Sequence, residues 1–192
     1  MMRKILKSRL SGRSGFTLSE TLMAILILLM VSSIVAAGIP VAANAYSKVV
    51  MASNAQLLLS TTMTNLRDEL GTATDIHYNA ETGEISYKND RGGRSRIYMI
   101  TAVDPDDGIT KDDFGVHVEE RAGRDDTEEY SSYDYMLVSD VAATENLFLT
   151  YTVESNSGGF IKFSDLTVQT KDDDRKVISK IENFEIKVLT VK

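Results

Sequence analysis

Cysteine is absent from this 192-residue chain, which excludes disulfide bonds and thiolate metal sites. Histidine is almost as rare, because His77 and His117 are the only two and lie far apart in the sequence. The chain also lacks the serine of a nucleophile elbow, a phosphate-binding glycine loop and the H-E-x-x-H pattern of zinc peptidases. We therefore expect the protein not to be an enzyme and to need no cofactor.

Positive charge is also in short supply. Lysine and arginine number 21 against 28 for aspartate and glutamate, so the formal net charge is −7. Residues 1–15 hold five of the basic residues and no acidic one, which leaves 16 basic and 28 acidic side chains in residues 16–192. A nucleic-acid binder normally carries a basic stripe, so we expect no direct binding of nucleic acid. The acidic balance is typical of a soluble, exported surface.

The longest single feature is an uncharged run over residues 21–47. As a helix it would be about 40 Å long at roughly 1.5 Å per residue, enough to cross a hydrocarbon core of about 30 Å. The basic residues before it predict that residues 1–15 face the cytoplasm and that the C-terminal part lies outside. Gly38 and Pro40 fall within the run, and Pro40 lacks the N–H that a helix interior needs, so we expect a kink there.

A single carboxylate, that of Glu20, stands at the start of this run. Burying a carboxylate in lipid costs several kcal/mol unless something neutralises it, so a glutamate in this position indicates a function. The residues around it are Gly15-Phe16-Thr17-Leu18-Ser19-Glu20. They resemble the class III signal sequence of type IV pilins and pseudopilins. That motif is glycine, an apolar residue, threonine, leucine, any residue and glutamate, followed by an apolar stretch of membrane length.

This resemblance implies how the chain is processed and assembled. A prepilin peptidase would cleave between Gly15 and Phe16 and methylate the new amino terminus at Phe16. In a helical filament, Glu20 would pair with the N-terminal ammonium of a neighbouring pilin subunit, and an assembly-platform membrane protein would be a further partner. In filaments of this family, the helix can unwind around a helix-breaking residue such as Gly38 or Pro40. The other interpretation is a tolerated kink in a membrane helix.

The same resemblance implies a location. The subunit would be a single-pass protein of the cell membrane, in contact with the lipid bilayer, before it joins an extracellular filament. Adhesion, motility, DNA uptake and secretion all use this architecture. The acidic domain with its long loops favours a minor subunit.

Two other interpretations of the N-terminal region stay open. Ala43-Asn44-Ala45 looks like a small-x-small cleavage site, so the region could be an ordinary secretory signal or a plain anchor. The apolar run is long for a signal peptide, and Glu20 would have no purpose in one. The alternative function is a membrane-anchored or secreted β-rich ligand-binding domain that does not polymerise.

The pattern beyond the apolar run predicts an α+β, pilin-like fold with one long N-terminal helix packed against a C-terminal antiparallel sheet. We expect a leader over 1–15, the membrane or filament-core half of the helix over 16–47, its amphipathic half over 48–71, and a β-rich domain over 72–192. The apolar stripe of the amphipathic half comprises Ala52, Ala55, Leu59, Met63, Leu66 and Leu70, and Gly71 stops the helix. Alternating patterns predict strands over 75–78, 84–88, 94–101, 115–120, 133–139, 147–154, 160–169 and 176–191.

One segment of the β-rich domain is a weak candidate for a calcium site. Its aspartates are Asp104, Asp106, Asp107, Asp112 and Asp113. Calcium takes six to eight oxygen ligands from such groups. The spacing does not fit an EF-hand, because Val103 would occupy the first ligand position when Gly108 occupies the sixth. We therefore favour a solvated acidic turn over a metal site.

Two further patterns concern the strands. His117 alternates with Val116 and Val118, so we expect its side chain to point to solvent. Tyr130, Tyr133 and Tyr135 cluster within a second acidic segment, 119–134, which we interpret as a surface loop. They could form an adhesive patch, since tyrosine is favoured at interfaces. We favour the other interpretation, in which Tyr133 and Tyr135 fill one face of a strand in the core.

Overall fold

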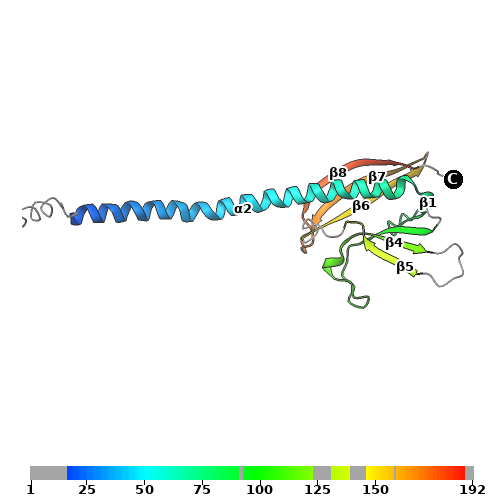
Figure 1. Ribbon diagram of the computed structural model, residues 1–192, viewed down its shortest axis with the longest axis horizontal. Coiled ribbons are helices and arrows are strands. Elements are labelled where there is room, and N and C mark those ends of the chain that lie inside the picture. The colour runs from blue at the N-terminus through cyan, green and yellow to red at the C-terminus, as the bar shows by residue number, and fades with distance from the viewer. Residues whose placement is uncertain (1–16, 91–92, 123–130, 139–145, 158, 189–192) are drawn as a thin grey trace, which may run out of the picture. The chain divides into compact units, whose positions relative to one another are not determined.

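The computed structural model describes residues 17–90, 93–122, 131–138, 146–157 and 159–188. The first element within these residues is α2, a helix over Leu18–Gly71 that ends at the predicted glycine (Figure 1). The helix is continuous through Gly38 and Pro40, so the expected kink does not interrupt it. The chain forms two compact units, Met1–Lys48 and Val49–Lys192, and α2 contributes to both.

The second half of α2 packs against the β-rich part of Val49–Lys192 through one stripe. The buried residues of the helix are Ala55, Leu58, Leu59, Thr62, Leu66 and Leu70. They recur every three or four residues, as the helical period requires. Ala52 is exposed, contrary to the predicted stripe, because burial along α2 begins at Ala55. Met63 is only half-buried at the margin of the core.

Within the described residues, eight strands follow the helix, one for each predicted strand. The first five are β1 (Thr74–Tyr78), β2 (Ile85–Lys88), β3 (Arg94–Ile100), β4 (Gly115–Ala122) and β5 (Ser131–Met136), with a short 3-10 helix, η1 (Lys111–Asp113), before β4. The last three are β6 (Leu147–Ser157), β7 (Phe160–Thr170) and β8 (Val177–Lys187). β5 ends before the predicted limit, and Leu137 and Val138 form a turn.

The strands form two antiparallel sheets, whereas the sequence pattern led us to expect one. The first sheet has the order β1-β2-β3-β4-β5 and the second has the order β6-β7-β8. The two sheets approach each other where β4 contacts β6. Figure 1 shows β6, β7 and β8 alongside the C-terminal half of α2. Alternating apolar residues identify strands but carry no record of which strands pair, so the division could not be seen in the sequence.

One hydrophobic core joins α2 to both sheets. It includes Leu66 of α2, Ile97 of β3 and Phe163 of β7, each of which is fully buried. Tyr151 of β6 links the sheets, because its hydroxyl lies 2.9 Å from the carbonyl oxygen of Gly83 and 3.3 Å from that of Ile97. Its single proton can be donated to either oxygen. The two sheets and the helix therefore form one packed domain within Val49–Lys192.

Tyrosines that are fully or partly buried predict a loss of stability in alkali. Burial raises the pKa of four tyrosine hydroxyls, those of Tyr87, Tyr98, Tyr135 and Tyr151. The unfolded value is about 10, so above that pH the unfolded chain releases protons that the folded chain still holds. We expect the free energy of unfolding to be insensitive to these groups below about pH 10 and to decrease as the pH rises further.

Denaturant titrations of the full-length chain in detergent, carried out between pH 8 and pH 11.5, measure this decrease. Tyr151→Phe should show a shallower decrease than the wild type, because phenylalanine has no proton to lose. Tyr46, which is 73% exposed, provides the control, and Tyr46→Phe should keep the wild-type pH dependence. Identical slopes for Tyr151→Phe and the wild type would contradict the assignment.

Candidate functional site

Glu20 and Thr17 close the N-terminal end of α2 as a capping box. The Thr17 backbone N–H and its hydroxyl each donate to Glu20 Oε2 at 2.9 Å, and the Glu20 N–H lies 3.4 Å from Thr17 Oγ1. In a capping box, a threonine at the N-cap and a glutamate three residues later each accept a hydrogen bond from the other's backbone N–H group, which has no partner within the helix. Thr17 was not predicted to have this role, although the T-x-x-E spacing of Thr17 and Glu20 is the sequence signal of a capping box.

The proposed cleavage residues, Gly15 and Phe16, lie outside the described residues. Thr17, the second residue after the proposed cleavage site, caps α2, which begins at Leu18. Among the described residues, the hydrogen bonds to Glu20 all reach Oε2, so Oε1 has no partner there.

The N-terminal part of α2 exposes apolar side chains throughout. Residues 17–48 contain no buried side chain in the described structure. The exposed large apolar residues run from Leu18 to Val50 along the helix. The helix is long and apolar enough to cross a membrane, and it lies near the N-terminus. Both Gly38 and Pro40 lie within this exposed part, and a Cβ atom added at Gly38 would meet no other atom within 4 Å.

The five aspartates of the calcium candidate are divided between a turn and η1. Asp104 bridges Ile109 in the turn and accepts a hydrogen bond from the backbone N–H of Asp106 at 3.1 Å. Asp113 accepts from the backbone N–H of Thr110 at 2.8 Å and from its hydroxyl at 2.9 Å, and these bonds lower the pKa of Asp113. Asp107 is exposed in the turn and Asp112 is exposed in η1. Across the described ranges, no three potential metal-ligating side chains come together.

His117 is buried, with 8% of its surface exposed, so the prediction that it faces solvent is wrong. Its Nε2 donates to the carbonyl oxygen of Asp113 at 2.8 Å, because a carbonyl can only accept. Its Nδ1 lies 3.5 Å from Asp134 Oδ1 and makes no hydrogen bond to any described residue. The ring of Tyr98 packs 5.5 Å away. The alternating pattern placed His117 on the face opposite the core, but Tyr98 and the residues before β4 cover that face.

Tyr133 and Tyr135 are 66% and 40% exposed, so the interpretation that they fill the core is wrong. Both lie on β5, the last strand of its sheet. The Tyr135 hydroxyl is 3.4 Å from Glu69 Oε1 and 3.4 Å from Glu120 Oε1. An edge strand has a neighbour on one side only, which the alternating pattern could not reveal. Tyr130 lies outside the described residues.

The acidic segment 119–134 is also less of a loop than expected. Glu119 and Glu120 belong to β4, and Asp134 belongs to β5. Glu119 accepts from Arg96, and Asp134 accepts from the hydroxyl of Tyr98. Residues 123–130 lie outside the described part. The side chains of Glu119 and Asp134 therefore take part in cross-strand pairs.

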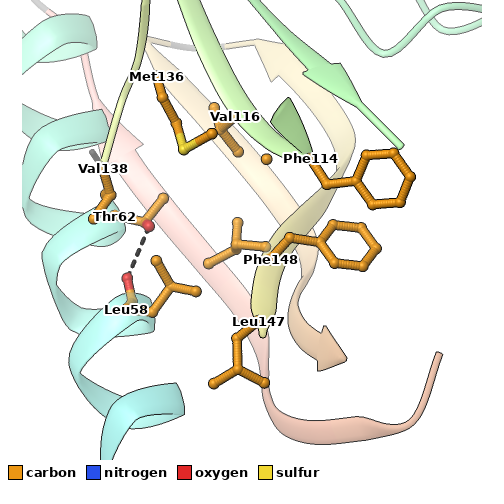
Figure 2. A pocket seen from close by; sticks show the side chains of 10 residues that line it. Leu58, Thr62, Phe114, Val116, Met136, Val138, Leu147 and Phe148 are labelled. Carbon is orange, nitrogen blue, oxygen red and sulfur yellow. Dashed lines mark hydrogen bonds between the residues drawn. The ribbon is translucent and has the colours of Figure 1, made fainter. Parts of the chain in front are cut away.

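Figure 2 shows an apolar cavity where α2 meets both sheets. It is lined by Leu58, Thr62, Phe114, Gly115, Val116, Met136, Val138, Leu147, Phe148 and Leu149. Thr62 satisfies its own hydroxyl by donating to the carbonyl oxygen of Leu58 at 2.8 Å. The volume of about 10 Å³ suits a single water at most, whereas ligand pockets measure about 300–1,000 Å³. This cavity is a packing gap and not a small-molecule site.

The described residues thus carry one arrangement that points to function, the capped and exposed apolar helix with Glu20 at its start. No family model matches the chain, and neither a curated protein nor a solved structure does.

Proposed function

We propose that the chain is a structural subunit, and a minor one, of a type IV pilus or pseudopilus filament. It is made as a prepilin, cleaved by a prepilin peptidase between Gly15 and Phe16, methylated at Phe16 and assembled through its N-terminal helix. Its partners are other pilin subunits, an assembly-platform membrane protein and the lipid bilayer. Before assembly, the subunit resides in the cell membrane with its C-terminal domain outside the cytoplasm. It then joins an extracellular filament.

The uncovered apolar surface of α2 is the observation that carries this proposal. Its large apolar residues run from Leu18 to Val41 and recur at Tyr46, Val49 and Val50, beyond the polar Asn44 and near Lys48. The whole stretch is about 50 Å at roughly 1.5 Å per residue, whereas a hydrocarbon core is about 30 Å thick. Exposure of apolar surface to water is unfavourable. The apolar residues of α2 that extend beyond the hydrocarbon core therefore need to be buried against something other than lipid. Neighbouring helices in a filament supply that cover, and a plain anchor has no equivalent.

The geometry of Glu20 supports the same proposal. Thr17 satisfies Oε2, while Oε1 has no partner among the residues that the structure describes. A carboxylate in an apolar bundle is favourable only with a partner, so an ammonium from a neighbouring subunit would complete the site. The charge then fixes the register of one subunit against the next.

The first test is the amino-terminal residue and mass of the protein purified from its native host. We expect the chain to begin at Phe16 and to carry an added methyl group. A chain that begins at Tyr46 would indicate a conventional secretory signal, and an uncut Met1 would indicate a permanent anchor. Either result would overturn the proposal and favour the non-polymerising ligand-binding domain.

A further inference from the structure

The imidazole of His117 is buried, and one of its nitrogens makes no hydrogen bond within the described residues. Its Nε2 donates to the carbonyl oxygen of Asp113 at 2.8 Å, and a neutral imidazole has only one N–H group. Its Nδ1 is therefore an acceptor without a proton in the neutral form, with almost no access to solvent. A buried polar atom without a partner is unfavourable, so this environment does not suit the neutral ring.

The carboxylate of Asp134 faces this nitrogen. Asp134 Oδ1 lies 3.5 Å from Nδ1, and Asp134 Oδ2 accepts a hydrogen bond from the Tyr98 hydroxyl. An ionised carboxylate can only accept, so two acceptors oppose each other while the ring is neutral. One added proton on Nδ1 makes this nitrogen a donor and places opposite charges beside each other.

The other charges around the ring leave this attraction in place. The charged side chains there, besides that of Asp134, include Glu84, Arg96, Asp113, Glu119 and Lys171. The cation Arg96 forms ion pairs with the two glutamates, which compensate its charge. The Asp113 carboxylate interacts electrostatically with both His117 and Lys171. Burial opposes a charge on the ring, whereas the carboxylates of Asp113 and Asp134 favour it.

We propose that His117 is a proton switch that ties the edge strand β5 to the rest of its sheet. Asp134 belongs to β5, which lies at the end of the order β1-β2-β3-β4-β5. With Nδ1 protonated, the Asp134 carboxylate accepts hydrogen bonds from Tyr98 of β3 and from His117 of β4. Without that proton, Asp134 keeps the bond from Tyr98 and loses the one from His117.

The switch makes the folded chain more stable as the pH falls from 8 to 5. An unfolded histidine takes up its proton near pH 6.5, in water and with no carboxylate held against it. In the folded chain the same proton adds a charge-assisted hydrogen bond, so the folded chain holds it more tightly. The stabilisation is therefore present below about pH 6.5 and is lost as the pH rises above that value.

NMR of the imidazole nitrogens in the full-length chain in detergent micelles tests the switch directly, because it shows which nitrogen carries a proton. We expect His117 to carry a proton on Nε2 alone at pH 8 and on both nitrogens at pH 5. A histidine that only fills the core would stay neutral at both values. His77→Gln leaves a single histidine to observe, and the His77 side chain is 72% exposed, so the change spares the core.

Asp134→Asn removes the charge and keeps the shape. The asparagine oxygen can still accept from Tyr98, and its amide can donate to Nδ1, so the neutral ring gains a partner. In denaturant titrations, the folded-to-unfolded ratio of the wild type should be about tenfold higher at pH 5 than at pH 8, as a charge-assisted hydrogen bond supplies. Asp134→Asn should lose most of this pH dependence.

Asp75→Asn is the matched control, because it makes the same change 3.3 Å from the other histidine, His77. That pair is exposed and contributes little to stability, so this variant should keep the wild-type pH dependence. Few other side chains titrate in this range, since the chain has two histidines and no cysteine.

The proposal is overturned if Nδ1 of the wild type stays unprotonated at pH 5, or if Asp134→Asn keeps the full pH dependence. It is also overturned if Asp75→Asn loses as much pH dependence as Asp134→Asn does. Both readouts require only the folded chain and no filament. A failure here would therefore leave the proposed assembly function untouched, and a failure of assembly would leave this switch standing.

Discussion

Glu20→Gln is expected to abolish filaments while leaving the cleavage after Gly15 intact. Glutamine can form the same capping box with Thr17, so the start of α2 is preserved and only the charge is lost. Leaving one member of a buried ion pair without its partner costs about 3–5 kcal/mol, which corresponds to at least a hundredfold loss in association. The yield of filaments sheared from cells, measured by immunoblot, should fall by about that factor.

The matched control is Asp68→Asn, which neutralises an exposed carboxylate elsewhere on α2. This variant should assemble like the wild type, because its charge faces water in Val49–Lys192. The mass of Glu20→Gln subunits in the membrane fraction should show a chain that begins at Phe16. Normal filament yield from Glu20→Gln would refute the role assigned to the charge.

Phe163→Ala is expected to destabilise the β-rich domain by about 3–5 kcal/mol, as is typical for removing a buried phenylalanine. The Phe163 side chain is fully buried. Its ring lies 5.6 Å from that of Tyr151 and 5.7 Å from that of Phe184, so it connects all three strands of the second sheet. Denaturant unfolding of the full-length chain, followed by circular dichroism, measures the change.

Phe160 is the matched control, because it lies on the same strand, β7, but is 43% exposed. Phe160→Ala removes the same atoms from a position that has less buried surface to lose, so we expect a change below about 1 kcal/mol. Comparable losses from both variants would show that the core does not depend on Phe163. The pair separates burial from the intrinsic preference of phenylalanine for strands.

The elements of this fold could be predicted because each has a local cause. The period of the apolar residues separates the helix from the strands, and Gly71 ends the helix as expected. All eight predicted strands are present, from β1 to β8. The predicted stripe was wrong at Ala52, which is exposed, and at Met63, which is only half-buried, and it omitted the buried Leu58 and Thr62. Local patterns succeed here because hydrogen bonding within α2 and alternation along a strand involve residues close in sequence.

The wrong predictions concern whether a side chain is covered by other parts of the protein. This is decided by residues far apart in sequence. His117 was expected in solvent but is buried against Tyr98 and the carbonyl of Asp113. Tyr133 and Tyr135 were expected in the core but are exposed on the edge strand β5. A strand pattern shows which residues share a face, but it does not show what lies on that face.

The sequence by itself determined the order of helix and strands, the apolar run of membrane length and the motif that ends at Glu20. These follow from periodicity, charge and spacing within short stretches of chain. Only the tertiary structure decided that the strands form two sheets, that Thr17 holds Glu20 and that His117 is buried. The sheets depend on strand pairing, and the register of a pair is set by contacts between residues distant in the chain.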